Sequence, residues 1–545
     1  MSRRVVVIGG VAGGMSAAAR LARLESDARI TVLESSGHVS YANCGLPYYV
    51  GGAIEDEEQL LLSDPVSLGQ RFGLDVRVNS TATHIDRQSK TVSVVGPEGQ
   101  YQLDYDQLVL SPGARAIRPN IPGSERLLTI QRVEEAVVAR AATEGATSAV
   151  VIGGGFIGLE MAENLVARGV RVSLIEAADE VLGALDAEMA VNVRWELEMM
   201  GVDVRVGTSV TSVDESGATL SDGTRIPAQL VVAAIGVRAN SELAAECGLA
   251  IGRHGGIVID ENGRTSDESI FAVGDAVEKT DGLSGEASMV YLANVANRQG
   301  RRVADAICGL VSPGVGALGT AIVKVFGLSA ATVGWNERRL RVAGREFLAI
   351  HTHPANHAGY YPGAMGMSLK LLISPQGEIL GAQGVGYDGV DKRIDVLATA
   401  MRGGIPAGDL ADLELAYAPP FGSAKDPVNM LGWIAQNRLS ERDHAIQWHE
   451  VEARRAGGAT LLDVRSPEEF AAGAIPGSVN IPVDELIERI DEVDEQVVVI
   501  CQAGQRAHVA ARRLADSGRR VSNLDGGWRT WMAGHSTTSV AAAAR

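Results

Sequence analysis

Cysteine is scarce in this chain: its 545 residues include only four, at positions 44, 247, 308 and 501. So few isolated cysteines do not form the disulfide framework on which small secreted proteins depend. We therefore expect a cytoplasmic protein, in which a cysteine is either catalytic or inert. Cys247 and Cys308 are expected to be small core residues, which leaves Cys44 and Cys501 for chemistry.

Long apolar runs and positive charge are also lacking. No run of about 18 or more apolar residues occurs, so no membrane insertion is expected. Two arginines followed by a strand at Val5 do not resemble a signal peptide. The formal net charge of −18 argues against nucleic acid or an anionic membrane as the main partner, although it leaves room for a local basic pocket.

Glycine, in contrast, is abundant. The chain has 64 glycines, is 46% hydrophobic and 21% charged, and has only 4% aromatic residues, a composition typical of an α/β enzyme with many tight turns. Its length is too great for one hydrophobic core, so about three or four domains are expected.

The first glycine-rich stretch has the pattern of a dinucleotide-binding unit. A strand from Arg4 to Ile8 leads into the turn Gly9-Gly10-Val11-Ala12-Gly13-Gly14 and a helix to about Arg23; a strand from Arg29 to Leu33 then ends in Glu34. Glycines let the backbone approach a pyrophosphate at a helix N-terminus, and the acid accepts from ribose hydroxyls. Valine replaces the second glycine of the motif. The residues expected to bind are Gly9, Gly13, Gly14 and Glu34.

The same unit returns complete in the middle of the chain. A strand from Ser148 to Ile152 precedes the turn Gly153-Gly154-Gly155-Phe156-Ile157-Gly158, a helix from Leu159 to Arg168, and a strand from Arg171 to Ile175 that ends in Glu176. The Glu176 carboxylate would bind a ribose 2′-hydroxyl and repel a 2′-phosphate, which favours NADH. NADPH stays possible because an arginine is nearby. The residues expected to bind are Gly153, Gly155, Gly158 and Glu176.

Three later strands end in turns suited to ligand binding. Ser111-Pro112-Gly113 follows a strand from Leu108, Gly236 follows a strand from Val232, and Gly274-Asp275 follows a strand from Ile270. The Asp275 carboxylate can bind a ribityl or ribose hydroxyl. Two nucleotide units could instead be a duplicated fold with one inactive site, and these turns argue against that alternative.

On these residues the chain resembles the two-dinucleotide-fold flavoprotein disulfide reductases. The resemblance implies an α/β fold with two Rossmann-like domains. FAD would be bound by residues 1–115 and 250–320, NAD(P)H by residues 116–249, and residues 321–440 would form an α/β dimerisation domain. It further implies that Asp275 contacts the flavin and that Phe156 is an aromatic gate over it, with Glu160 on the same helix. Core packing is the alternative for Phe156.

A second cysteine motif lies near the C-terminus. A polar linker over residues 441–457 is expected to precede a small α/β domain over residues 458–540. Its motifs are Asp463-Val464-Arg465, the loop Gly473 to Pro482, and Cys501-Gln502-Ala503-Gly504-Gln505-Arg506 between a strand and a helix. In this order they resemble a single-domain rhodanese, which implies a persulfide at Cys501.

The turn at Cys501 gives a physical reason for this chemistry. Backbone N–H groups, the helix dipole and Arg506 all favour a thiolate at Cys501 and an anionic sulfur bound to it. A phosphatase-like loop that binds an oxyanion is the alternative.

Cys44 lies in the stretch Ser40-Tyr41-Ala42-Asn43-Cys44-Gly45-Leu46-Pro47-Tyr48, without a second cysteine four or five residues on. A single thiol beside a flavin can store oxidation only as a sulfenic acid, a mixed disulfide or a persulfide. Its substrate must therefore carry sulfur or peroxide, and its thiolate, favoured by the flavin environment, would attack a disulfide or an outer sulfur. A small buried thiol in a loop is the alternative.

The Cys44 stretch is similar to that of coenzyme A disulfide reductases. With the rhodanese domain, nearly the whole chain resembles the NADH-dependent persulfide and polysulfide reductases of that subgroup. The resemblance implies a homodimer in which Tyr361 and Tyr417 of one subunit reach the redox cysteine of the other, with Tyr360 as a rival for the first position. Turn packing is the alternative for these tyrosines.

The same resemblance implies bound coenzyme A. Its phosphates would meet Arg20 and Arg23, and its thiol end would lie near Ser40 and Asn43. The alternative is that both arginines are solvated residues on a helix face.

The sequence therefore predicts a cytoplasmic, homodimeric FAD enzyme without a metal site, which uses NADH to reduce coenzyme A persulfide, polysulfide or coenzyme A disulfide at Cys44. Sulfur would pass from Cys501, through coenzyme A, and leave as sulfide. One alternative is an NADH oxidase or peroxidase that cycles through a Cys44 sulfenic acid, although the histidine expected near the first glycine turn is missing. Others are coenzyme A disulfide reduction as the main activity, and a sulfur-transfer or sensing module with an inactive reductase half.

Overall fold

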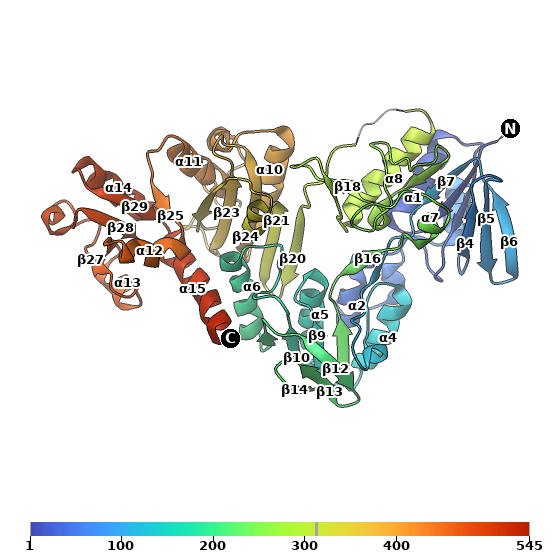
Figure 1. Cartoon of the computed structure of the whole chain (residues 1–545), viewed down its shortest axis with the longest axis horizontal. Helices are drawn as coiled ribbons and strands as arrows, with labels where there is room; N and C mark the ends of the chain where they lie inside the picture. Colours follow the sequence, from blue (N-terminus) through green and yellow to red (C-terminus); the bar gives the residue numbers. More distant parts are fainter. Residues whose placement is uncertain (1, 311–313, 544–545) are drawn as a thin grey trace. The chain divides into compact units, whose positions relative to one another are not determined.

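The computed structural model describes residues 2–310 and 314–543. The chain divides into two compact units, one comprising Met1–Ile175 and Ser209–Gly319, the other Glu176–Thr208 and Thr320–Arg545. Figure 1 labels the helices and strands of both units.

A parallel five-stranded sheet forms the base of the first unit. Its strand order is β17-β7-β1-β2-β3. The strands are β1 (Arg4–Ile8), β2 (Arg29–Leu33), β3 (Asp75–Arg77), β7 (Gln107–Leu110) and β17 (Ile270–Ala272). Because β17 pairs with β7, the chain between them is an insertion into this fold. β1 and β2 have the bounds that the sequence predicts.

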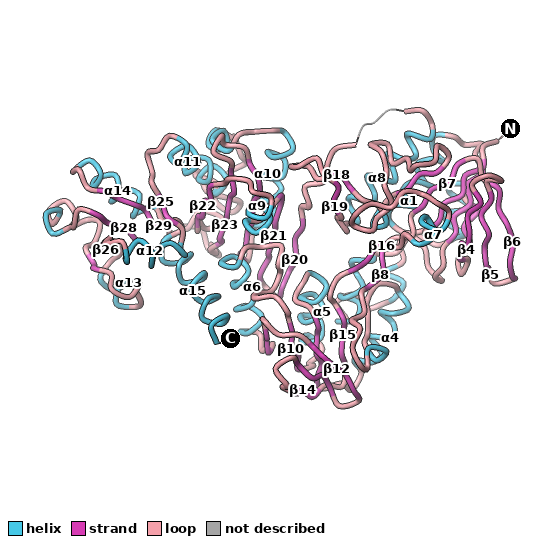
Figure 2. Tube along the Cα trace, viewed as in Figure 1, coloured by secondary structure: helices cyan, strands magenta, loops and turns pink. Residues whose placement is uncertain are grey.

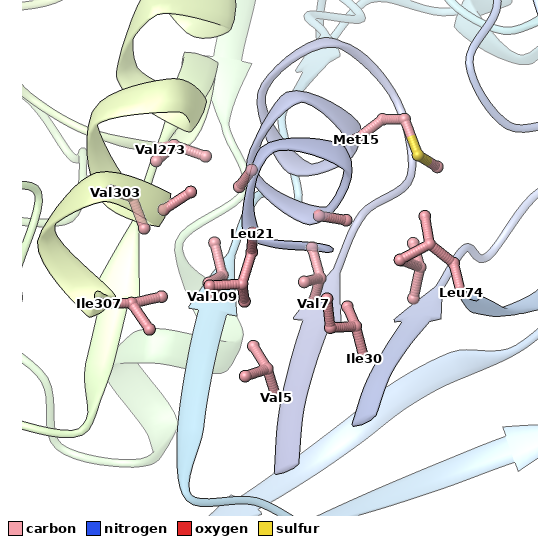
Figure 3. Close-up of a cluster of buried hydrophobic side chains, with 14 of the residues drawn as sticks. Val5, Val7, Met15, Leu21, Ile30, Leu74, Val109, Val273, Val303 and Ile307 are labelled. Carbon is pink, nitrogen blue, oxygen red and sulfur yellow. The ribbon is translucent and has the colours of Figure 1, made fainter. Parts of the chain in front are cut away.

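Two helices cover this sheet and pack against each other, namely α1 (Ala12–Leu24) and α8 (Ala293–Ile307). Figure 3 shows the buried cluster that they share with the strands, in which Leu21, Val7 and Val303 point toward one another. The two helices meet closely, because a Cβ on Gly300 would come 2.2 Å from the carbonyl oxygen of Gly13. This packing fixes the first glycine turn.

The inserted segment contains a second parallel sheet, of order β10-β9-β15 in this unit. Its strands are β9 (Ser148–Ile152), β10 (Arg171–Ile175) and β15 (Leu230–Ala233). Helix α5 (Phe156–Ala167) follows β9 and begins three residues earlier than the sequence predicts. It can do so because Gly158, which lacks a side chain, lies directly against the Gly153 carbonyl.

Smaller elements complete the first unit, including a separate antiparallel sheet of β4, β5 and β6, visible in Figure 2. The helices are α2 (Leu46–Gly51), α3 (Pro65–Phe72), α4 (Val133–Thr143) and α7 (Glu242–Glu246). The strands are β4 (Thr81–Asp86), β5 (Thr91–Gly96), β6 (Gly99–Asp104), β8 (Ala114–Ala116), β12 (Val210–Asp214), β13 (Gly217–Leu220), β14 (Arg225–Pro227), β16 (Val237–Ala239), β18 (Lys279–Thr280) and β19 (Ala287–Ser288).

An antiparallel sheet of order β20-β21-β24-β23-β22 is central to the second unit. The strands are β20 (Ala321–Val325), β21 (Leu328–Gly334), β22 (Leu348–Thr352), β23 (Met367–Ile373) and β24 (Ile379–Gly386). The same unit contains α6 (Ala187–Met199), β11 (Asp203–Arg205), α9 (Glu337–Val342), α10 (Val390–Gly403) and α11 (Pro427–Leu439). Helices α6 and α10 pack against β24.

The C-terminal part of this unit has its own parallel sheet, of order β25-β29-β28-β26-β27. The strands are β25 (Ala445–Ile446), β26 (Thr460–Asp463), β27 (Val479–Asn480), β28 (Gln496–Ile500) and β29 (Arg520–Leu524). The helices are α12 (Val451–Ala456), α13 (Pro467–Ala471), α14 (Gln505–Asp516) and α15 (Gly527–Ala543). The expected linker over 441–457 contains β25 and α12, and β25 extends the sheet.

All four cysteines are free, as the sequence predicts. Within the part of the chain that the structure describes, no helix combines the length and the apolar character needed to cross a bilayer.

Candidate active site

Cys44 lies on a short 3-10 helix, η1 (Asn43–Gly45), directly before α2. Backbone hydrogen bonds hold this stretch in place: the Ser40 N–H donates to the Gly10 carbonyl at 2.8 Å, and the Ala42 N–H donates to the Leu60 carbonyl at 2.7 Å. Cys44 is exposed. This exposure argues against a small buried thiol, and the hydrogen bonds join the stretch to the first glycine turn.

Helix α2 also brings Tyr48 to the inserted segment. A Cβ on Gly51 would come 2.0 Å from Asn164 Oδ1, so the close packing of α2 on α5 depends on glycine at this position. As a result the Tyr48 hydroxyl donates to Glu160 Oε1 at 3.4 Å. The Tyr48 phenol and the Glu160 carboxyl group are thus joined by a hydrogen bond near Cys44, where a proton can be held.

The charges around Cys44 oppose its ionisation. Burial raises the pKa of Glu160 to about 7; the Tyr48 hydrogen bond acts the other way, and the neighbouring Glu163 adds to the rise. Although Cys44 is exposed, the surrounding protein partly shields its thiol from water; this partial burial is the largest cause that raises the Cys44 pKa, followed by Glu160 and Asp275. The protein groups alone therefore favour the thiol, so the favoured thiolate expected from the sequence requires a contribution from the flavin.

Asp275 has the property expected of a ligand-binding carboxylate. It lies on η4 (Gly274–Ala276), and its Oδ1 is buried without a hydrogen-bond partner among the described residues. Leaving such an atom unpaired costs about 1–3 kcal/mol, so a ligand hydroxyl fits this position. Burial raises the pKa of Asp275, opposed by Lys279, whose Nζ donates to the Gly274 carbonyl at 2.6 Å. These groups fit the ribityl chain of a flavin.

The first glycine turn is shaped for a nucleotide. Gly9 has a φ of +101°, and a Cβ there would come 2.0 Å from the Ser111 carbonyl oxygen. A Cβ on Gly14 would come 1.9 Å from the Gly9 carbonyl oxygen. The buried Glu34 carboxylate accepts from the Gly10 N–H and the Ser36 N–H, each at 2.9 Å. Glu34 is thus held at the end of β2, where the sequence predicts a ribose ligand.

The second glycine turn repeats this geometry and leaves space. Gly153 has a φ of +102°, and a Cβ on Gly158 would come 1.9 Å from its carbonyl oxygen. A Cβ on Gly155 would meet no described atom within 4 Å, so the turn is open where a pyrophosphate would approach. Phe156 is half-buried as the first residue of α5. Glu176 directly follows β10, and its Oε1 accepts from the Ala178 N–H at 2.8 Å.

Asn240 joins the remaining two predicted turns. Its side chain donates to the Pro112 carbonyl at 2.9 Å, and its backbone N–H donates to the Gly113 carbonyl at 3.0 Å. Gly236 precedes it with a φ of +104°, where β16 pairs with β8. The turns after β7 and β15 are therefore held together.

The two candidate coenzyme A arginines differ in their surroundings. Arg20 Nε lies 2.8 Å from Asp305 Oδ1 of α8, so its charge is already paired. Arg23 is exposed, and its guanidinium lies 5.9 Å from the centroid of the Phe72 ring. Asn43 is exposed beside Cys44, and Ser40 has a φ of +49°, which fixes the bend before it.

Three exposed tyrosines lie together in the second unit. The hydroxyl groups of Tyr360 and Tyr417 are 3.1 Å apart, whereas the Tyr361 ring packs edge-on against His357 at 5.6 Å. The Ala358 N–H donates to the Gly422 carbonyl and joins the two loops. The structure thus pairs Tyr417 with Tyr360, the rival position, and not with Tyr361.

Cys501 is buried at the end of β28. The Gly504 N–H donates to Cys501 Sγ at 3.1 Å, and Gly504, with a φ of +95°, is the N-cap of α14. On the other side, the Trp528 N–H donates to the Cys501 carbonyl at 2.8 Å. A backbone N–H directed at the sulfur at a helix N-terminus is the arrangement that the sequence predicts for a sulfur-carrying thiolate.

Arg506 makes a two-point ion pair with Glu469, at 2.6 and 2.7 Å. This contact lowers the pKa of the Glu469 carboxyl to about 2, and it means that the Arg506 charge is shared with Glu469 and is not directed at Cys501 alone. Nearby, the buried Arg465 pairs with Asp463 at 2.6 Å and lies over the Trp528 ring, 5.0 Å from its centroid.

A cavity of about 330 Å³ adjoins these residues. Its walls are formed by Arg465, Glu469, Ala472, Gly473, Gln502, Trp528 and Arg529. Two guanidinium groups and an indole ring make it suitable for an anionic sulfur compound next to Gln502, the residue after Cys501.

Sequence reasoning assigned no role to Tyr48, Lys279 or Glu469. The sequence held a signal for the first two, because Tyr48 lies four residues after Cys44 and Lys279 lies four residues after Asp275. The partner of Arg506 had no local signal, since Glu469 lies 37 residues away.

Comparison with known families agrees with this architecture. The pyridine nucleotide-disulphide oxidoreductase family matches residues 3–300, its dimerisation domain matches residues 320–427, and the rhodanese-like domain matches residues 447–534. The chain therefore belongs to the pyridine nucleotide-disulphide oxidoreductase family and carries a C-terminal rhodanese-like domain.

Three known proteins are similar to this chain over most of its length. A coenzyme A disulfide reductase of Staphylococcus haemolyticus is 31% identical over 443 residues, covering 80% of this chain and 100% of the relative. The crystal structure of the reduced CoADR-RHD of Bacillus anthracis is 43% identical, with a TM-score of 0.96 and 98% of both chains covered. An NAD-dependent persulfide reductase from A. fulgidus is 40% identical, with a TM-score of 0.92, covering 97% of this chain and 100% of the other.

Proposed function

We propose that this chain is a cytoplasmic, homodimeric, FAD-dependent reductase that uses NADH to reduce persulfide, polysulfide or coenzyme A persulfide and disulfide at Cys44. The observation that carries the proposal is an exposed single cysteine beside the Tyr48–Glu160 contact, in a chain with a second cysteine in a rhodanese-type loop. The names of the relatives, coenzyme A disulfide reductase and persulfide reductase, favour the same class of substrate.

The cofactor sites follow from the two glycine turns. FAD would lie on the first turn, with Glu34 at the ribose and Asp275 at the ribityl chain, and NADH on the second, with Gly155 at the pyrophosphate and Glu176 at the ribose. Bound FAD would supply the electron pair that NADH delivers. The unpaired Asp275 oxygen and the open space at Gly155 support these positions.

Cys44 would act as the nucleophile. Its thiolate attacks the outer sulfur of a persulfide, R–S–S⁻. The S–S bond of the substrate breaks, the R–S group takes up a proton and departs as the thiol R–SH, and the outer sulfur stays on Cys44 as a persulfide. Two electrons and a proton then release HS⁻ and restore the thiolate. Glu160, whose pKa lies at about 7, can hold a proton near neutral pH through its contact with Tyr48.

The exposed tyrosines would serve the other subunit of the dimer. Tyr417, with Tyr360 or Tyr361, would donate to the thiolate that leaves Cys44. Their exposure supports this role, because in a single chain their hydroxyl groups are open to a partner surface.

Cys501 would supply the sulfur. Its persulfide transfers the outer sulfur to the thiol of coenzyme A, giving coenzyme A persulfide and a free Cys501 thiol. The coenzyme A persulfide then reaches Cys44, with Arg23, Ser40 and Asn43 around the carrier. Turnover of polysulfide and persulfide that is unchanged in Cys501→Ser would overturn this relay.

One alternative has support from the same site. An exposed thiol can also cycle through a sulfenic acid, so an NADH oxidase or peroxidase fits the accessibility of Cys44. A sulfur-transfer or sensing module with an inactive reductase half does not fit two intact nucleotide turns.

Absorbance spectroscopy of the purified holoprotein separates these possibilities. We expect a yellow protein that NADH bleaches under anaerobiosis, and that coenzyme A persulfide or coenzyme A disulfide restores without oxygen. If only peroxide or oxygen restored the yellow colour, the result would favour the oxidase or peroxidase. A colourless protein would contradict both flavin-dependent functions.

A further inference from the structure

Buried charges join the central antiparallel sheet of the second unit to the rhodanese-like domain. Lys370 of β23 is fully buried and its Nζ contacts Asp186 at 2.9 Å, Glu337 at 2.6 Å, and Glu188. His351 of β22 continues the chain of contacts, since its Nε2 lies 3.1 Å from Glu188 Oε1. The three carboxylates could suggest a metal site, but the Lys370 ammonium occupies the position of the cation.

The same histidine reaches across to the rhodanese-like domain. His351 Nδ1 lies 2.6 Å from Asp525 Oδ2, and the His351 backbone N–H donates to the same oxygen at 3.0 Å. Arg438 donates to Asp525 Oδ1 at 2.8 Å. Burial opposes a charge on His351, but the hydrogen bonds that its ring donates to Asp525 and Glu188 outweigh this effect and raise the His351 pKa to about 9. At neutral pH an imidazolium therefore bridges two buried carboxylates.

Asp525 begins the segment on which the Cys501 loop rests. The Trp528 N–H donates to the Cys501 carbonyl at 2.8 Å, and the Arg529 N–H donates to the Gln502 carbonyl at 3.2 Å. A Cβ on Gly527 would come 2.3 Å from the Cys501 carbonyl oxygen. On the opposite side, a Cβ on Gly526 would come 2.8 Å from the His351 Cβ. The peptide of residues 526–527 thus fills the space between His351 and the Cys501 loop.

We propose that His351 is a positioning residue for Cys501. Its bond to Asp525 fixes the segment behind the cysteine loop, and this in turn keeps the Gly504 N–H directed at the Cys501 sulfur. The assignment of sulfur chemistry to Cys501 rests on the proposed function, whereas the contacts do not. A consequence is that the rhodanese-like domain is anchored to the central sheet of its own unit.

The test compares His351→Gln with Glu180→Gln. Glu180 forms a buried ion pair with Arg194 in the same unit, at 3.0 Å, and contacts neither Asp525 nor the cysteine loop. Two properties of Cys501 are measured: the pH profile of its alkylation in a Cys44→Ser background, and sulfur transfer from thiosulfate to cyanide. In the latter, the Cys501 thiolate takes the outer sulfur and releases sulfite, and cyanide then takes the sulfur as thiocyanate.

We expect His351→Gln to raise the midpoint of Cys501 alkylation by about one pH unit and to lower the sulfur-transfer kcat by about tenfold, because the thiolate loses an aligned N–H donor. Glu180→Gln should lower the melting temperature without moving either readout. If His351→Gln behaves like Glu180→Gln, the contact is merely structural and the proposal is wrong.

Two further measurements cover a variant that does not fold. Asp525→Asn keeps the shape of the side chain and should shift the same readouts in the same direction. In the unaltered chain, hydrogen exchange of residues 501–504 should accelerate relative to β23 as pH rises through the His351 pKa. The charged and titratable groups that act on or respond to this ring include Glu188, Lys370, Asp525 and His353. Equal changes in both segments would contradict the proposal. Loss of NADH-driven reduction alone would count against the proposed function and leave these Cys501 readouts intact.

Discussion

Glu160 is the residue that decides the charge state of the Cys44 environment. Its carboxyl is half-buried on α5, accepts from Tyr48, and has a pKa raised to about 7, chiefly by burial. Below that pH it is neutral, and above it a negative charge opposes the Cys44 thiolate. Near neutral pH Glu160 can therefore give a proton to a leaving thiolate, whereas its charged form makes the Cys44 thiolate less favourable.

Replacing Glu160 with glutamine should therefore ease the ionisation of Cys44. In Glu160→Gln the negative charge is gone at every pH, so the midpoint of Cys44 alkylation should fall by about half to one pH unit. The measurement is the rate of iodoacetamide labelling against pH in the FAD-loaded protein, in a Cys501→Ser background.

Glu163→Gln is the matched control. Glu163 raises the pKa values of Glu160 and Tyr48. It is not among the causes that raise the Cys44 pKa, which are burial, Glu160 and Asp275. Its Cys44 midpoint should stay close to that of the parent. A midpoint that stays constant or rises in Glu160→Gln would show that Glu160 does not control the thiol.

Single residues were predictable where their signal is local. Cys44, Asp275 and Cys501 stand in short motifs, and the structure has each at the end of a strand or the start of a helix. Contacts between residues distant in sequence could not be predicted, because tertiary packing alone creates them. Tyr48 and Glu160 are 112 residues apart, and His351 and Asp525 are 174 residues apart. Which of Tyr360 and Tyr361 accompanies Tyr417 at the redox cysteine of a partner subunit stays a prediction; within one chain the Tyr417 hydroxyl lies 3.1 Å from that of Tyr360.

At the scale of elements, the two glycine turns share one construction with one difference. In each, the first glycine has positive φ and the last lies against its carbonyl oxygen. The middle position is Val11 in the first turn and Gly155 in the second, where the space beyond the backbone is open. The second turn thus keeps room for the pyrophosphate of the nucleotide that we propose to bind there.

Alanine at two positions of the second turn separates ligand approach from folding. Gly155→Ala meets no described protein atom, so we expect a normal melting temperature, normal flavin content and a KM for NADH raised about tenfold or more. Gly158→Ala collides with the Gly153 carbonyl, so it should lower the melting temperature as well. The readouts are steady-state NADH kinetics and thermal unfolding, and an unchanged KM in Gly155→Ala would contradict the placement of NADH.

The strand and helix pattern was largely predictable, because hydrophobic runs between glycine turns determine it. β1, β2, β9 and β10 match the expected ranges residue for residue. Composition alone does not predict the structure of the stretch over 441–457. Its charged residues suggest a linker, yet Ala445 and Ile446 pair with β29. The buried side chains of Ile446 and Val451 hold the stretch in place.

At the scale of the whole molecule, the two chemical cysteines belong to different compact units, Cys44 to the first and Cys501 to the second. We propose that the first unit carries out the reduction and that the second captures the sulfur. We propose coenzyme A as the carrier between them. The surroundings of each cysteine are fixed by packing: those of Cys44 by the contacts of η1 and α2, and those of Cys501 by the contacts of Asp525 to Trp528.

The reduction of sulfane sulfur by Cys44, with electrons from NADH, is what we propose for this chain. It is tested most directly by strictly anaerobic assays of NADH oxidation with coenzyme A persulfide, recording sulfide release in the parent chain and in Cys44→Ser. We predict sulfide in a stoichiometric ratio to NADH consumed, and no activity in Cys44→Ser despite normal flavin content. Rapid turnover of coenzyme A disulfide with little sulfide from the persulfide, or turnover only after oxygen or peroxide is admitted, would contradict it.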